Sequence, residues 1–217
     1  MDLFIAKLFN PATQFFALCW IVVVIISITL HELAHGWTAY RLGDPTPMAM
    51  GRLTGNPLVH MGPFSLVALA IVGIAWGQMP IDSSRLRGRH AEALVAAAGP
   101  ATNVLLALLA MVTCGLLIRF SLLPGDDELA KRIVLFLSVA GSANLWLAVF
   151  NLMPVPPLDG SHIVATYARF YARFVWEPGN QGFMILAFVF GFVIFDTLIS
   201  SRLIVLSERL IALIAGI

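Results

Sequence analysis

The chain has 217 residues, of which 59% are hydrophobic and only 12% are charged, and its formal net charge is +1. Soluble domains carry roughly a quarter charged residues, so this composition indicates a membrane protein with the lipid bilayer as its surroundings. The small net charge gives no indication of a nucleic-acid partner. Cys19 and Cys114 both lie in apolar runs and are expected to be buried thiols.

Four apolar stretches are long enough to span a bilayer, which takes about 20 residues. In chain order they cover residues 15–40, 91–120, 133–152 and 183–200, and residues 203–217 either span or lie at the interface. Residues 63–76 and 163–176 are shorter and are expected to be re-entrant or tilted, and residues 48–54 predict a short strand. The expected fold is all-α: a polytopic membrane helix bundle of one domain, residues 1–217, with a small membrane-associated β or re-entrant element after the first span.

Arginines set the expected orientation, because Lys and Arg concentrate on the cytoplasmic side of membrane proteins. Three arginines in residues 85–89, together with Arg41 and Arg52, place the C-terminal end of the first span on that side. The acidic residues 126–128 would then face outward. This arrangement brings the end of the first span and the proline-rich stretch after residue 151 to the same leaflet.

The first span contains an H-E-x-x-H pattern at residues 31–35. Residues four apart share one face of a helix, so His31 and His35 can bind one Zn²⁺ ion per chain. Glu32 lies beside them and can take a proton from a water molecule that the metal activates. Ionisable residues inside a span are costly and usually functional, which favours a metal site over a chance match.

Two histidines leave a catalytic zinc site short of its usual third protein ligand. Asp159 is the best candidate, because it ends the stretch N-L-M-P-V-P-P-L-D-G at residues 151–160. Prolines disrupt helix, and non-helical backbone at membrane depth survives only where it is buried in protein or lines a wet cavity. From spacing alone, an ordinary surface loop ending in Asp-Gly is an equal alternative.

Three further polar residues lie near these motifs. Asn151 directly precedes the helix break and is expected to donate to the oxyanion of a tetrahedral intermediate or to position the substrate. Asn103 has the same options, although a structural bond to a neighbouring helix is favoured. His162, three residues after Asp159, is an alternative ligand or a partner of one, although a surface-facing histidine is favoured.

Taken together, these motifs resemble the site-2 proteases, the intramembrane zinc metalloproteases. Gly99-Pro100-Ala-Thr-Asn103 is similar to the G-P-x-x-N element of that family, and residues 43–46 and 51–60 are similar to the segment after the zinc helix in short bacterial members. No PDZ or CBS domain is recognisable. The resemblance implies that His31, His35 and Asp159 bind zinc, that Glu32 is the base, and that the protein carries out regulated intramembrane proteolysis.

The expected activity is therefore that of a zinc metalloendopeptidase of the cell membrane. It would cut transmembrane or membrane-anchored protein substrates within the bilayer, toward the cytoplasmic side. A metal transporter is the first alternative and would need two facing ligand-rich helices. A catalytically silent binding protein is the second and would lack Glu32 or a ligand. Assembly into a homo-oligomer is left open.

Overall fold

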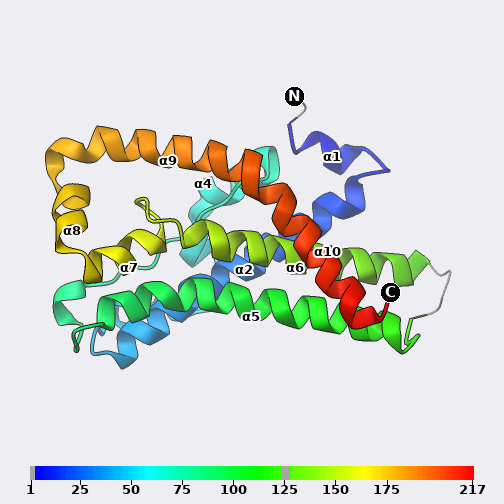
Figure 1. The fold of residues 1–217 in the computed structure, drawn as a ribbon, viewed down its shortest axis with the longest axis horizontal. Coiled ribbons are helices and arrows are strands. Elements are labelled where there is room, and N and C mark those ends of the chain that lie inside the picture. The colour runs from blue at the N-terminus through cyan, green and yellow to red at the C-terminus, as the bar shows by residue number, and fades with distance from the viewer. Residues whose placement is uncertain (1–2, 124–127) are drawn as a thin grey trace.

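The computed structural model describes residues 3–123 and 128–217, which form a bundle of long helices (Figure 1). Within this part of the chain, four helical stretches are apolar and long enough to cross a membrane: α2 (Gln14–Arg41), α5 (Ala91–Arg119), α6 (Glu128–Asn151) and Pro178–Ala215. The shorter elements are α1 (Ala6–Phe9), α3 (Thr46–Ala49), α4 (Pro57–Val72), η1 (Ser83–Arg85), α7 (Asp159–Tyr167) and α8 (Arg169–Trp176). Of the acidic segment expected to face outward, residues 126 and 127 lie outside the described residues.

The C-terminal stretch is one continuous helical path, not a span followed by a separate segment. It comprises η2 (Pro178–Asn180), α9 (Gln181–Phe195), the single π-helical turn η3 (Asp196–Ser200) and α10 (Ser201–Ala215). Residues 192–215 contain neither proline nor glycine, so nothing in the sequence ends the helix between the two apolar stretches. The π turn accommodates an inserted residue without ending the helix.

Small residues bring the central helices together. A side-chain carbon at Gly141 of α6 would lie 2.7 Å from Cγ of Met111 on α5, and one at Gly115 would lie 2.6 Å from Cβ of Ile214 on α10. Residues without a side chain let helix backbones approach closely in a membrane. Cys19 and Cys114 are both buried and free, as predicted. The close packing of α5 against α6 places the polar residues of one helix beside those of the other.

The prediction of a strand at residues 48–54 is wrong. These residues form the end of α3 and a series of turns, and the described residues contain no strand. Asp44 accepts a hydrogen bond from the backbone N–H of Thr46 at 2.9 Å, which begins a helical turn. Gly51 then adopts a positive φ of 64°, a conformation that glycine tolerates and that ends an extended run.

The prediction of a re-entrant element at residues 63–76 is also wrong. The chain forms the kinked helix α4, which Asn56 caps by accepting from the N–H of Leu58 at 3.0 Å. The kink falls at Gly62, whose φ is 69°, and the helix ends at Gly73. Residues 74–82 then run without regular structure. Residues 163–176 form the end of α7 and the helix α8, which lies across one end of the long helices (Figure 1).

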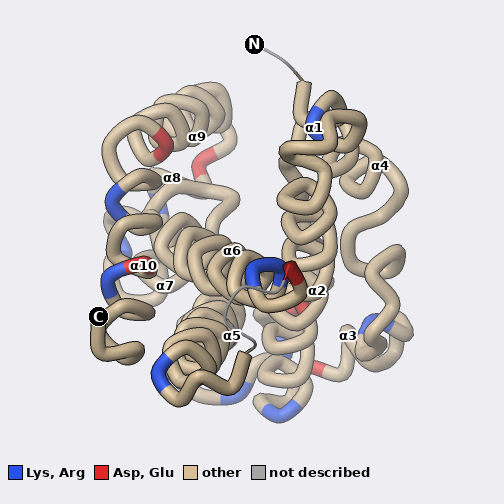
Figure 2. Tube along the Cα trace, turned by 90° about the vertical axis from the view of Figure 1, so that its right-hand side faces the viewer, with Lys and Arg blue, Asp and Glu red and all other residues tan. Residues whose placement is uncertain are grey.

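Charged residues are sparse along the bundle, and several mark the ends of the long helices (Figure 2). Arg41 is the last residue of α2, Arg119 the last of α5 and Glu128 the first of α6. Between these ends the helices are strongly apolar. This distribution suits helices that cross a membrane and keep their ionisable ends near water.

Candidate metal and catalytic site

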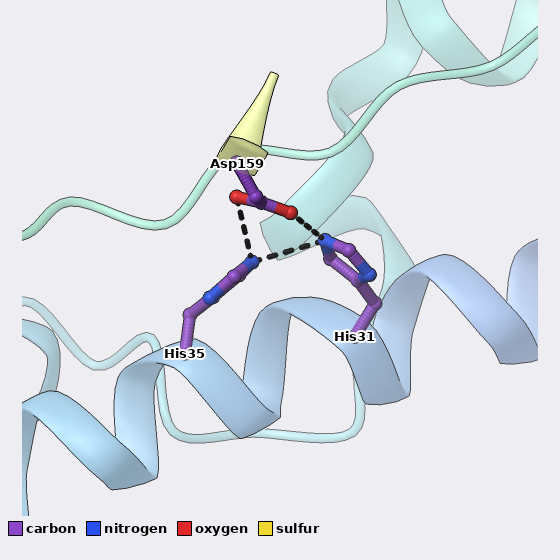
Figure 3. A group of neighbouring side chains, drawn as sticks. All are labelled: His31, His35 and Asp159. Atoms are coloured by element: carbon purple, nitrogen blue, oxygen red, sulfur yellow. Dashed lines mark hydrogen bonds and ion pairs between the residues drawn. The ribbon is translucent and has the colours of Figure 1, made fainter. Parts of the chain in front are cut away.

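Three side chains from two distant segments converge inside the bundle (Figure 3). His31 and His35 lie one turn apart on α2, and Asp159 is the first residue of α7. Nε2 of His31 is 3.1 Å from Oδ2 of Asp159, and Nε2 of His35 is 3.3 Å from Oδ1. The two Nε2 atoms are 3.0 Å apart. Both histidines are buried, and the three residues together could hold a metal ion.

The hydrogen bonds on the far side of the two rings determine which nitrogens face the centre. Nδ1 of His35 is 2.7 Å from the backbone carbonyl of Val95, which can only accept, so Nδ1 carries the proton. Nδ1 of His31 is 2.6 Å from Oδ1 of Asn103 and is likewise the donor. In both neutral rings the unprotonated Nε2 therefore faces the centre, as a metal ligand requires.

The arrangement fits a tetrahedral zinc ion. Zinc bonds of about 2.0–2.2 Å place neighbouring ligand atoms about 3.3–3.6 Å apart, close to the 3.0 and 3.1 Å found between the ligand atoms of His31 and its two partners. Oδ2 of Asp159 is buried and has no hydrogen-bond donor within the described part of the chain. Two imidazole lone pairs and a carboxylate that face one another need a cation between them.

Glycine at position 99 leaves space at this centre. A side-chain carbon there would lie 2.5 Å from Nε2 of His31 and closer still to Nε2 of His35. Gly99 lies on α5, next to Pro100, which has no N–H for the carbonyl one turn earlier and loosens the helix. The helix thus presents bare backbone to the histidines, and Val95 on the preceding turn offers its carbonyl to His35.

Asp159 reaches α2 because the proline-rich stretch turns the chain back after α6. Val155 donates to the carbonyl of Met153 at 2.8 Å, and Leu158 donates to the carbonyl of Val155 at 3.0 Å, so the turn is held by its own backbone. A side-chain carbon at Gly160 would overlap the carbonyls of Leu152 and Met153. The glycine of the L-D-G run is therefore required for close packing of this turn.

Glu32 lies on α2 between the two histidines and is buried, with 7% of its surface exposed. The extended segment after α4 covers it: a side-chain carbon at Gly77 would lie 2.6 Å from Cγ of Glu32. Ser65 anchors this segment, because its hydroxyl donates to the carbonyl of Trp76 at 2.7 Å and accepts from its N–H at 2.8 Å. Glu32 is thus enclosed beside the histidines, and Gly77 is among the residues that cover it.

The other residues predicted for the site, Asn103, Asn151 and His162, differ in what they contact. Asn103 contacts His31 directly, whereas Asn151 donates to the carbonyl of Leu147 at 2.9 Å, within its own helix. The oxyanion roles predicted for both amides stay predictions. His162 lies 3.6 Å from a carboxylate oxygen of Glu92 and packs on Trp176, with its side chain 39% exposed.

Asn144 was not expected at the site. It is buried on α6, and its Oδ1 accepts a hydrogen bond from Nδ2 of Asn103 at 2.9 Å. The signal was available in the sequence, because Asn144 is an amide in an apolar span, as Asn103 is. Gly77 and Gly99 carried no such signal, since their importance depends on which helix faces them.

An H-E-x-x-H helix inside an apolar bundle, with a carboxylate brought to its histidines, is the arrangement of a membrane metalloprotease. The chain belongs to peptidase family M50, whose sequence model matches residues 19–120 and 118–195. Zinc is the cofactor that goes with this family of metalloproteases.

Curated relatives agree with the family. The chain is 35% identical over 184 residues to "Putative zinc metalloprotease YwhC" of Bacillus subtilis, an alignment that covers 81% of this chain and 77% of the relative. It is 29% identical over 170 residues to the Rip2 protein of Mycolicibacterium smegmatis, which has the same description, covering 75% of this chain and 62% of the relative. The Rip2 protein of Mycobacterium tuberculosis (strain Erdman) is 30% identical over 179 residues, with 79% and 64% covered. The chain thus spans somewhat less than two thirds of the Rip2 proteins. No solved structure matches the chain.

Proposed function

We propose that residues 1–217 act as one intramembrane domain that hydrolyses peptide bonds in or near the transmembrane segments of protein substrates. The observation that carries the proposal is the convergence of His31, His35 and Asp159 within 3.0–3.3 Å of one another, with Glu32 enclosed beside them. His31, His35 and Asp159 are the proposed zinc ligands, and Glu32 is the proposed general base.

Glu32 and the two histidines have different roles in the proposed peptide-bond hydrolysis. Zinc, when bound, polarises water and the substrate carbonyl. Glu32 takes a proton from the attacking water and delivers it to the leaving amine, which balances the hydrolysis. The ordered Nδ1 bonds of the two histidines keep both rings fixed during this step. The burial of Glu32 excludes bulk water from the proton transfer.

The proposed location follows from the helices that hold the site. His31 and His35 lie in the C-terminal half of α2, which ends at Arg41, and the backbone N–H of Arg87 donates to the carbonyl of Leu42 at this end. The distribution of positive charge favours the cytoplasmic leaflet of the cell membrane for this end. A substrate that reaches the site from the bilayer would be a transmembrane or membrane-anchored segment, unwound locally so that its backbone is accessible.

Asn151 is the proposed donor to the substrate. One hydrogen of its amide is used on the carbonyl of Leu147, and the amide has a second hydrogen. Its position at the end of α6, before the turn to Asp159, supports a role in holding the substrate carbonyl. Asn151→Asp, which removes the donor but keeps the size, is expected to raise the barrier to cleavage by about 2.7–4 kcal/mol, as loss of one oxyanion donor does elsewhere, with zinc content unchanged.

The experiment that tests the function is cleavage of a generic transmembrane peptide in reconstituted vesicles. Wild type should cut the peptide within its apolar segment, which mass spectrometry of the products would locate. Glu32→Ala and a chelator-treated wild type should not. Equal cleavage by all three preparations would refute the proposal.

The transporter alternative receives no support from the distribution of ligands. Across residues 3–123 and 128–217, His31, His35 and Asp159 form the one group of three or more His, Cys, Asp or Glu side chains placed to share a metal. A transport path would need a second such group for the ion to move to. Zinc uptake into vesicles that contain the protein is expected to equal that of protein-free vesicles.

A further inference from the structure

A chain of three hydrogen bonds, which we call the amide relay, runs from α6 through α5 to the zinc-site histidine on α2. Nδ2 of Asn144 donates to the carbonyl of Ala140 at 2.9 Å. Oδ1 of Asn144 accepts from Nδ2 of Asn103 at 2.9 Å, and Oδ1 of Asn103 accepts from Nδ1 of His31 at 2.6 Å. Asn103 is fully buried, and Asn144 is 3% exposed.

This chain has one consistent direction. An amide side chain can present either its oxygen or its nitrogen to a neighbour, but the carbonyl of Ala140 can only accept, so it fixes the nitrogen of Asn144 on its own side. The oxygen of Asn144 then faces Asn103 and fixes the nitrogen of Asn103 there. The oxygen of Asn103 is left for His31, so Nδ1 of His31 must donate and Nε2 must be unprotonated.

We propose that Asn144 is a positioning residue of the zinc site, acting through Asn103 to hold His31 in the tautomer that can bind the metal. The inference rests on the proposed function, because it assumes that His31 is a zinc ligand. Asn103 alone could turn its amide over and offer an N–H to His31, which would favour the wrong tautomer. The second amide prevents this turn, because the flipped Asn103 would place oxygen against oxygen.

The amide relay also connects His31 on α2 to the helix that leads to Asp159. Asn144 lies two turns before the end of α6, and the same helix continues into the turn that presents Asp159. His35, by contrast, is fixed by a backbone carbonyl of α5 and needs no second residue to orient its partner. A displacement of α6 along α5 would therefore disturb His31 and Asp159 together.

The test is the zinc affinity of purified protein in detergent, measured by competition with a chromophoric chelator. Outer partners of metal-bound histidines typically contribute 10–100-fold to metal affinity, so Asn103→Leu is expected to weaken zinc binding about tenfold or more. Asn144→Leu should weaken it about threefold to tenfold, a smaller loss because His31 keeps its direct partner. Asn144→Asp, protonated because it is buried, would accept from Asn103 with one oxygen and donate to the carbonyl of Ala140 with the other, and should bind zinc as wild type does.

The decisive background is Asn103→Leu. Without an amide at position 103, Asn144 has no partner of His31 to orient. In this background Asn144→Leu should leave zinc affinity unchanged within about twofold, a coupling that a double-mutant cycle measures. An equal loss in both backgrounds would show that Asn144 acts through general packing of α6 and would overturn the proposal.

Two controls match the relay residues. Thr102→Val on α5 and Ser142→Ala on α6 each remove a hydroxyl that bonds only to its own helix backbone, and both should retain wild-type zinc affinity. His31→Ala distinguishes a failure of the proposed metal site from a failure of the amide relay. If it binds zinc normally, the proposed metal site is wrong; if it loses zinc while Asn144→Leu does not, only the relay is wrong.

Discussion

Nε2 of His31 and Nε2 of His35 face each other at 3.0 Å on consecutive turns of α2. Both rings use Nδ1 to donate to an oxygen on α5, so in the neutral rings neither Nε2 carries a hydrogen that could bridge the gap. Two lone pairs held this close repel each other unless a cation lies between them. The Asp159 carboxylate, placed against both nitrogens, supplies the negative charge that such a cation needs.

Removal of a ligand is the first prediction. His35→Ala and Asp159→Ala are each expected to weaken zinc binding by more than about a hundredfold, beyond the loss seen for outer partners, and to abolish peptide cleavage. Zinc content after gel filtration and competition with a chelator would measure this.

The matched control for the ligands is His162→Ala. This histidine is three residues from Asp159, but it contacts Glu92 and Trp176. Its variant should keep a full equivalent of zinc. If the His162 variant lost zinc and the Asp159 variant retained it, His162 and not Asp159 would be the third ligand.

Gly99→Ala tests how closely α5 approaches the metal site. The added carbon would overlap Nε2 of both histidines, so the helices must separate or the rings must turn. Overpacking of this kind costs about 1–3 kcal/mol, and we expect zinc affinity to fall by a corresponding factor of about 5 to 150.

Gly182→Ala on α9 is the control for Gly99→Ala, because a carbon there would meet nothing within 4 Å. It should leave zinc affinity as in wild type. If Gly99→Ala also binds zinc normally and folds, α5 is farther from the histidines than the structure places it.

Asp44 gives a prediction about pH. Burial raises the pKa of Asp44, but hydrogen bonds from Thr46 and from the backbone N–H of Asp82 outweigh it and hold that pKa below its ordinary value. Such a carboxylate adds stability above about pH 4, its unfolded value, and this contribution is lost as the pH falls through the lower folded-state pKa.

Asp44→Asn is therefore expected to lower the free energy of unfolding at pH 7 by about 1–3 kcal/mol, the cost of a mispaired buried group. The difference from wild type should shrink once the pH falls below about 4. Thermal unfolding in detergent at the two pH values would measure it, with the exposed Glu177→Gln as a control. If the difference were the same at both pH values, the ionised form of Asp44 would not be what stabilises its hydrogen bonds with the N–H groups of Thr46 and Asp82.

The long helices and the proposed metal ligands were accessible from the sequence because each has a local signature. The apolar runs predicted α2, α5 and α6, and the H-E-x-x-H spacing predicted that His31 and His35 share a face. Asp159 was less certain from spacing, and the structure brings it to the histidines. What spacing could not supply was the turn that reverses the chain after α6.

The incorrect expectations concern segments whose conformation depends on single residues. The strand expected at residues 48–54 gives way to α3 because the side chain of Asp44 begins a helical turn at Thr46. The two C-terminal apolar stretches, residues 183–200 and 203–217, are joined because a π turn continues the helix through Asp196–Ser200. Asn144 and Gly99 matter only through contacts between helices, which periodicity along one helix does not reveal.

Metal removal and restoration on wild type and on Glu32→Gln would show whether zinc and Glu32 together cleave the peptide bond, with cleavage of a transmembrane peptide as the readout. After chelation, one equivalent of zinc per chain should restore cleavage by wild type. Glu32→Gln should take up the same equivalent of zinc and stay inactive, because its amide cannot accept the proton. Cleavage by the zinc-loaded Gln variant at the wild-type rate would rule out Glu32 as the base, and cleavage by the metal-free wild type would rule out zinc-dependent hydrolysis.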